Sequence, residues 1–157
     1  MSGLFKNFLT VFFTVLVFSA TLVAQESDTE KWNKAQEEMK AMFGGVPVMF
    51  TKLPLHVRAN AWESFKAMNS PDAKIPAKYG ELMGLAVASQ IPCEYCVYAH
   101  TTMAKMLGAT EEEIQEAVMK GAEVRFWSTV LNGNHVDYES FKSEWDDMLE
   151  FVKANSK

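Results

Sequence analysis

Both cysteines of the chain lie in one short segment, and their spacing to a nearby histidine constrains the fold more than any other feature. Cys93, Cys96 and His100 follow the pattern C-x-x-C-x-x-x-H. Steps of three and four residues put side chains on one face of an α-helix, and the same spacing continues to Met103 and Leu107. The pattern therefore predicts a helix over 93–108 whose cysteine-bearing face points into the protein.

The rest of the chain predicts further helices and no strand. Apolar residues recur at helical spacing, and capping boxes are indicated by Ser27 with Glu30 and by Thr110 with Glu113. The predicted helices cover 27–43, 55–68, 76–90, 93–108, 110–121 and 137–153, with 122–131 either a further helix or a bent extension. The segment from Gly44 to Pro54 is expected to be irregular. The fold class is all-α, a bundle of about six or seven helices.

Glu81 lies in the predicted helix 76–90, which is apolar nearly all round and is therefore expected in the interior. A carboxylate in such a helix is costly unless it is paired. If helix 76–90 packs against helix 93–108, Glu81 reaches His100 or a thiol, directly or through a water. It would then accept a proton or orient the imidazole.

The two thiols have different expected roles. A cysteine reacts as the thiolate, which a helix N-terminus or a cationic histidine stabilises. His100 is one helical turn beyond Cys96 but about two turns beyond Cys93, so Cys96 is the better candidate for attack on a substrate. Cys93 could then attack a sulfenic acid on Cys96 and close a disulfide.

Three simpler interpretations compete with this one. The cysteines could form a structural disulfide, although so short a loop contributes little stability. Zinc is a second alternative, with Glu81, Cys93, Cys96 and His100 as ligands, but structural zinc sites usually use two separated pairs. Haem attachment of the c type requires a histidine directly after the second cysteine, and Val97 occupies that place. We expect no metal and no cofactor.

The N-terminus predicts export. Lys6 is followed by an apolar run from Phe8 to Ala24, and a polar acidic stretch comes next, as in a secretory signal peptide over 1–24. An uncleaved membrane anchor is the alternative. Without this segment the net charge is near −6, and no basic patch indicates a nucleic-acid partner. His56 and His135 are expected to face solvent or to cap helix ends.

The residues around the cysteines resemble a known family. The sequence reads ELMGLAVASQIPCEYCVYAH over 81–100 and then GATEEEIQEA, and over about 46–131 it is similar to the AhpD-like (alkyl hydroperoxide reductase D-like) branch of the carboxymuconolactone decarboxylase family. The resemblance implies an all-helical domain, here 46–157 after an N-terminal helix at 25–45, that assembles as a trimer, hexamer or other homo-oligomer. It also implies thiol-dependent peroxidase or disulfide reductase activity.

The resemblance assigns roles by position. Cys96 corresponds to the peroxide-reacting cysteine and Cys93 to its resolving partner, with Glu81 and His100 in the proton relay. Tyr95 stands where the best-studied members have a second histidine, so a phenol is a possible relay element here.

The expected substrates are a hydroperoxide or a disulfide, reduced with electrons from an unknown thiol reductant. Thiol-disulfide exchange outside the cytoplasm and a non-enzymatic oligomeric binding module are the alternatives. Lactone decarboxylation is not expected, because the decarboxylase branch lacks the CxxC.

Overall fold

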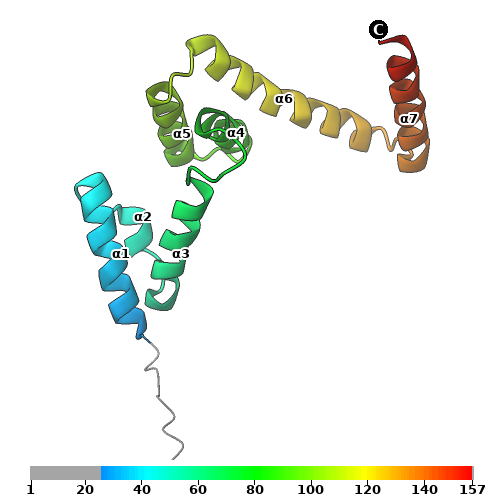
Figure 1. Ribbon diagram of the computed structural model, residues 1–157. Helices are drawn as coiled ribbons and strands as arrows, with labels where there is room; N and C mark the ends of the chain where they lie inside the picture. The colour runs from blue at the N-terminus through cyan, green and yellow to red at the C-terminus, as the bar shows by residue number, and fades with distance from the viewer. Residues whose placement is uncertain (1–25, 157) are drawn as a thin grey trace, which may run out of the picture. The chain divides into compact units, whose positions relative to one another are not determined.

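The computed structural model describes residues 26–156, which form seven helices and contain no strand (Figure 1). The expected all-α fold is confirmed. The helices are α1 (Asp28–Phe43), α2 (Val48–Thr51), α3 (Leu55–Met68), α4 (Ala77–Gln90), α5 (Glu94–Met106), α6 (Glu111–Gly133) and α7 (Tyr138–Asn155). The predicted signal segment 1–24 lies outside the described residues. Among residues 26–156, no helix is both long and apolar enough to cross a membrane.

The helix ends follow from local sequence. Ser27 and Glu30 form the predicted capping box of α1, and Thr110 and Glu113 form that of α6. Gly44 ends α1 with a φ of 75°, a left-handed conformation that glycine adopts without steric cost.

One connection differs from the prediction, and the structure decides between two alternatives for another stretch. The segment expected to be irregular contains the four-residue helix α2, whose Phe50 is buried. The stretch 122–131 extends the preceding helix and is not a further helix, since α6 runs without a break for 23 residues up to Gly133. No proline interrupts this stretch, so the backbone hydrogen bonding continues through it.

The chain divides into two compact units, and the first ends at Glu63, within α3. In the first unit Trp62 is fully buried and meets the Phe50 ring edge-on, with 5.7 Å between centroids. The Trp62 indole N–H donates a hydrogen bond of 2.7 Å to Glu38. The buried apolar residues of this unit are Trp32, Ala35, Met39, Phe50 and Trp62.

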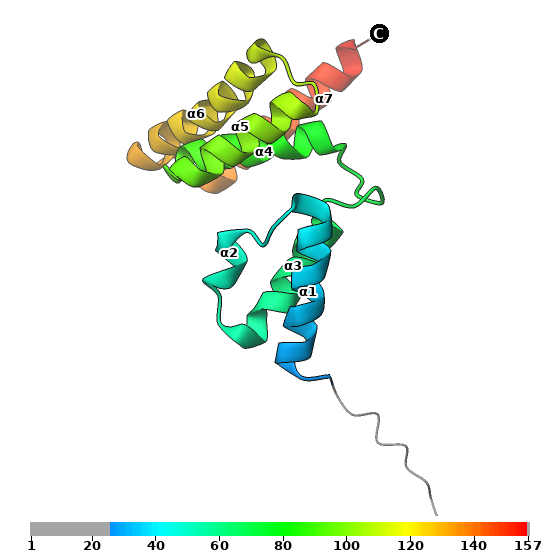
Figure 2. The same cartoon turned by 90° about the vertical axis from the view of Figure 1, so that its left-hand side faces the viewer.

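In the second unit α4 packs against both α5 and α6 (Figure 2). Its buried core consists of Leu82, Leu85, Ala104 and Ile114. Gly121 marks the close approach of α6 to α4, since a Cβ there would lie only 2.7 Å from the Ala86 carbonyl oxygen. The helix that carries Glu81 is thereby fixed against the helix that begins at the cysteines.

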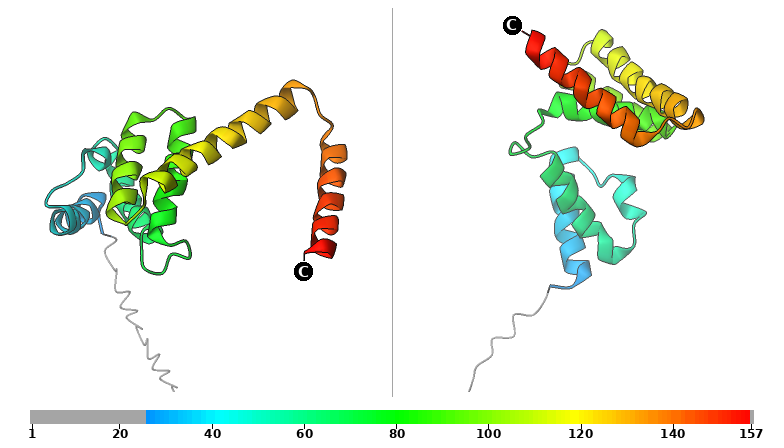
Figure 3. Two further views of the ribbon diagram at one scale, coloured as in Figure 1. Left: turned by 90° about the horizontal axis from the view of Figure 1, so that it is seen from above. Right: turned by 90° about the vertical axis from the view of Figure 1, so that its right-hand side faces the viewer.

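The expectation that α4 is interior on all sides is wrong for one face. Leu82, Leu85 and Ala88 are buried, but Met83 and Val87 are 55% and 61% exposed. The reason is that α5 and α6 cover only part of the α4 circumference. α7 follows α6 at the C-terminal end of the chain (Figure 3). No side chain of α7 is buried.

Candidate active site

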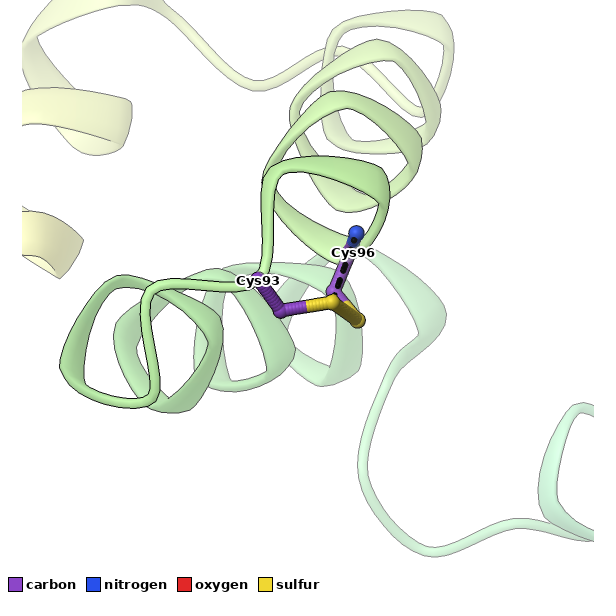
Figure 4. Close-up of a disulfide and its surroundings, with 2 residues drawn as sticks. All are labelled: Cys93 and Cys96. Carbon is purple, nitrogen blue, oxygen red and sulfur yellow. Dashed lines mark hydrogen bonds between the residues drawn. A yellow bond between two sulfur atoms is a disulfide. The ribbon is translucent and has the colours of Figure 1, made fainter.

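The first turn of α5 holds both cysteines, as predicted. Cys93 is the N-cap of the helix, and its sulfur accepts a hydrogen bond of 3.3 Å from the Cys96 N–H. The two residues are joined by a disulfide at the start of the helix (Figure 4). The Cys93 N–H donates to the Ala88 carbonyl, which ties this turn to the end of α4. The two sulfur atoms thus lie at the positive end of the α5 helix dipole.

The half-buried carboxylate of Glu81 pairs with the histidine rather than with a thiol. The distance from Glu81 Oε2 to His100 Nδ1 is 2.7 Å. The Glu81 side chain is 14% exposed and that of His100 36%, so both are partly shielded from solvent. When the carboxylate is ionised it can only accept, so Nδ1 then carries the hydrogen and Nε2 is the ring nitrogen that can accept a proton.

Glu81 also lines a cavity next to the site. It contributes to the wall of a cavity of about 420 Å³ whose other walls include Met68, Ile75 and Met83. Glu81 therefore lies between the imidazole of His100 and this cavity.

The face of α5 that meets α4 differs from the prediction on both sides of His100. Met103 and Leu107 are 40% and 39% exposed, whereas Ala104 is fully buried and Val97 packs against the core. Val97, His100 and Ala104 are themselves spaced by three and four residues, so they share one face of the helix. Around His100 the inner face of α5 therefore consists of Val97 and Ala104 in place of the predicted Cys96 and Met103.

Tyr95 is 81% exposed, on the outer side of α5. A relay through its phenol stays a prediction. His56 and His135 are exposed, which agrees with the expectation that they face solvent. In the part of the chain that the structure describes, no three or more His, Cys, Asp or Glu side chains gather in a group able to hold a metal ion.

One residue of the site was not singled out by the sequence analysis. Gly84 lies one turn beyond Glu81 in α4, and a Cβ there would overlap the His100 ring. The available signal was a glycine in the middle of a helix, where it is less favourable than alanine.

Comparison with known proteins gives three likenesses. The model of the carboxymuconolactone decarboxylase family matches residues 58–136. A protein of Paracoccus denitrificans described as uncharacterized protein 4 in the cox locus is 32% identical over 63 residues, which are 40% of this chain and 57% of that protein. The chain thus matches little more than half the length of this relative.

A solved structure has a similar fold. The crystal structure of the alkylhydroperoxidase AhpD core from Rhodospirillum rubrum superimposes with a TM-score of 0.61 at 19% identity. The match covers 71% of this chain and 85% of that one. At this identity the likeness concerns the fold, which is the AhpD-like arrangement of helices.

Proposed function

We propose, from the premise that this chain belongs to the carboxymuconolactone decarboxylase family and has an AhpD-like fold, that it is a thiol-dependent oxidoreductase that reduces hydroperoxides. The observation that carries the proposal is the combination of two contacts. The Cys93–Cys96 disulfide starts α5, and one turn further on His100 is hydrogen-bonded to Glu81. A cysteine pair one helical turn from a proton-accepting imidazole has the parts that peroxide reduction requires.

The reaction starts from the dithiol. His100 Nε2 takes the proton of Cys96, and the resulting thiolate attacks the terminal oxygen of the hydroperoxide. The O–O bond breaks, Cys96 becomes a sulfenic acid, and the imidazolium returns the proton to the departing alkoxide, which leaves as an alcohol. Cys93 then attacks the Cys96 sulfur and releases water, which gives the disulfide. Overall, one dithiol and one hydroperoxide yield one disulfide, one alcohol and one water.

Glu81 has a supporting role in this scheme. Its carboxylate holds Nδ1 protonated and so directs Nε2 to the proton transfer. It also stabilises the imidazolium that forms when His100 takes the proton. An external thiol reductant returns the disulfide to the dithiol.

The test separates the two cysteines. Reduced protein is mixed with one equivalent of cumene hydroperoxide, and the products are followed by mass spectrometry with dimedone as the sulfenic acid trap. Wild-type protein should form the disulfide without a dimedone adduct, and Cys93→Ser should accumulate the adduct on Cys96. Cys96→Ser should consume no peroxide. Full peroxide consumption by Cys96→Ser would refute the proposal.

Thiol-disulfide exchange is a second candidate, and the position of Cys93 favours it. The hydrogen bond from the Cys96 N–H and the helix dipole stabilise a thiolate at Cys93, which makes it a good leaving group in exchange. This function predicts that the protein oxidises a dithiol peptide in a reaction that requires Cys93 and is unaffected by Glu81→Gln. Peroxide reduction, in contrast, should slow in Glu81→Gln.

We also propose that the protein is exported and that it forms a homo-oligomer, a trimer or a hexamer. Large apolar side chains are exposed along the last two helices, which supports self-association. They include Val124 at 70%, Phe126 at 58%, Trp127 at 51% and Phe151 at 70% exposed. Light scattering of the purified protein should give a mass of three or six chains, and Phe126→Glu should reduce it. A wild-type mass of one chain would contradict the assembly.

A further inference from the structure

The His100 ring lies over a position of α4 that has no side chain. A Cβ built on Gly84 would be 2.5 Å from Cε1 of His100 and 2.7 Å from both Nδ1 and Nε2. An imidazole that pointed its Cε1 edge at this position would hold both nitrogens clearly farther away than Cε1. The similar distances mean that the face of the ring covers the Gly84 backbone.

The carboxylate that binds this ring belongs to the same face of the same helix. Glu81 and Gly84 are three residues apart, and side chains at this separation are neighbours on a helix surface. α4 therefore holds the imidazole at two points, through the carboxylate at Nδ1 and through the bare backbone under the ring. A methyl group at position 84 would leave the ring no room in its present place.

We infer that Gly84 is a positioning residue for His100. Its lack of a side chain lets the imidazole lie flat on α4, where Nδ1 meets Glu81 and Nε2 remains directed to proton transfer. What must yield to a larger residue is the end of a flexible side chain, so α4 should stay folded while the ring moves. The inference rests on the proposed function for its effect on the reaction, but the placement of the ring is measurable without it.

Gly84→Ala is the test variant, and Gly80→Ala is its matched control. Gly80 lies in the same helix one turn earlier, and a Cβ there would meet nothing within 4 Å. Both substitutions give the helix a similar gain in propensity, and only the one at position 84 meets the ring. Nitrogen-15 NMR of histidine-labelled protein reports which ring nitrogen carries the hydrogen, and His100→Asn assigns the His100 signals.

Wild-type protein and Gly80→Ala should show His100 with its hydrogen on Nδ1. Gly84→Ala should lose this single tautomer while its thermal unfolding remains cooperative. Disulfide formation with cumene hydroperoxide should slow by about 10²-fold in Gly84→Ala, since a misplacement of about 1 Å has that effect on a catalytic group. Gly80→Ala should keep the wild-type rate.

Four results would overturn the inference. They are an unchanged Nδ1 tautomer in Gly84→Ala, an equal slowing in both variants, a wild-type rate of disulfide formation in Gly84→Ala, and a Gly84→Ala chain that does not fold. If wild-type protein shows no peroxide reduction, the proposed function fails. The tautomer comparison still decides whether Gly84 positions the ring.

Discussion

Substitution of Gly121 by alanine tests the close packing that holds α4 in place. The added Cβ would lie 2.7 Å from the Ala86 carbonyl oxygen, and Gln90 Nε2 and Ser89 Oγ would follow at 3.2 and 3.3 Å. Carbon and carbonyl oxygen normally approach to about 3.3–3.6 Å, so the two helices would have to separate by roughly 0.6 Å or more. The nearest atom belongs to the backbone of a helix, which cannot rotate away as a side chain would.

The magnitude follows from two opposing effects. Overpacking of this kind costs about 1–3 kcal/mol, whereas alanine stabilises a helix interior by about 0.8–1.0 kcal/mol relative to glycine. Gly80→Ala has the second effect without the first, since its Cβ would enter open space. Gly121→Ala should therefore be less stable than Gly80→Ala by about 1–3 kcal/mol, which is the overpacking cost alone.

Amide hydrogen exchange in α4 is the suitable assay, because it reports on the second unit without a contribution from the first. The amides of Leu85 and Ala88, two buried residues of α4, should exchange about 5- to 150-fold faster in Gly121→Ala than in Gly80→Ala. Equal protection in the two variants would show that α4 and α6 have room to spare at Gly121. The packing argument would then be refuted.

The remaining predictions concern single contacts. Trp62→Phe removes the hydrogen bond to the Glu38 carboxylate and should destabilise the first unit by about 1.5–3 kcal/mol in urea titrations. A loss below about 0.5 kcal/mol, as at an ordinary surface position, would contradict the prediction. The hydrogen bond from Lys78 lowers the pKa of the Glu113 carboxyl below its ordinary value of 4.5. The ionised Glu113 therefore stabilises the folded protein above pH 4.5, and this stabilisation is lost as the pH falls through the pKa of Glu113 in the folded state. The free energy of unfolding of Glu113→Gln should be lower than that of wild type at neutral pH and equal to it well below pH 4.5. A difference in free energy that stays constant across this pH range would contradict the prediction.

Features fixed by neighbouring residues were predictable from the sequence. Ser27 with Glu30 and Thr110 with Glu113 mark helix starts because each contact spans three residues. The Glu81–His100 pair was predictable as one of two options, because a carboxylate in an apolar helix needs a partner. The roles of Cys93, Cys96 and Tyr95 remain predictions.

Features that depend on how one helix meets another were not predictable. Ala104 is buried and Met103 is not, because the side of α5 that is covered depends on how the neighbouring helices pack against it. The requirement for glycine at position 84 is set by a ring that comes from another helix. Burial of Phe50 in the short helix α2 likewise depends on Trp62 of α3, a contact that spans twelve residues.

The pairing of Glu81 with His100 joins residues that are only 19 positions apart, and both cysteines lie between them. The entropy lost on closing so short a loop is small, and contacts of low sequence separation form early in folding. A growing chain that has been synthesised only as far as α5 therefore already contains all four groups. The four groups of the site are thus contributed by one continuous stretch, 81–100, to which α6 and α7 supply no residue.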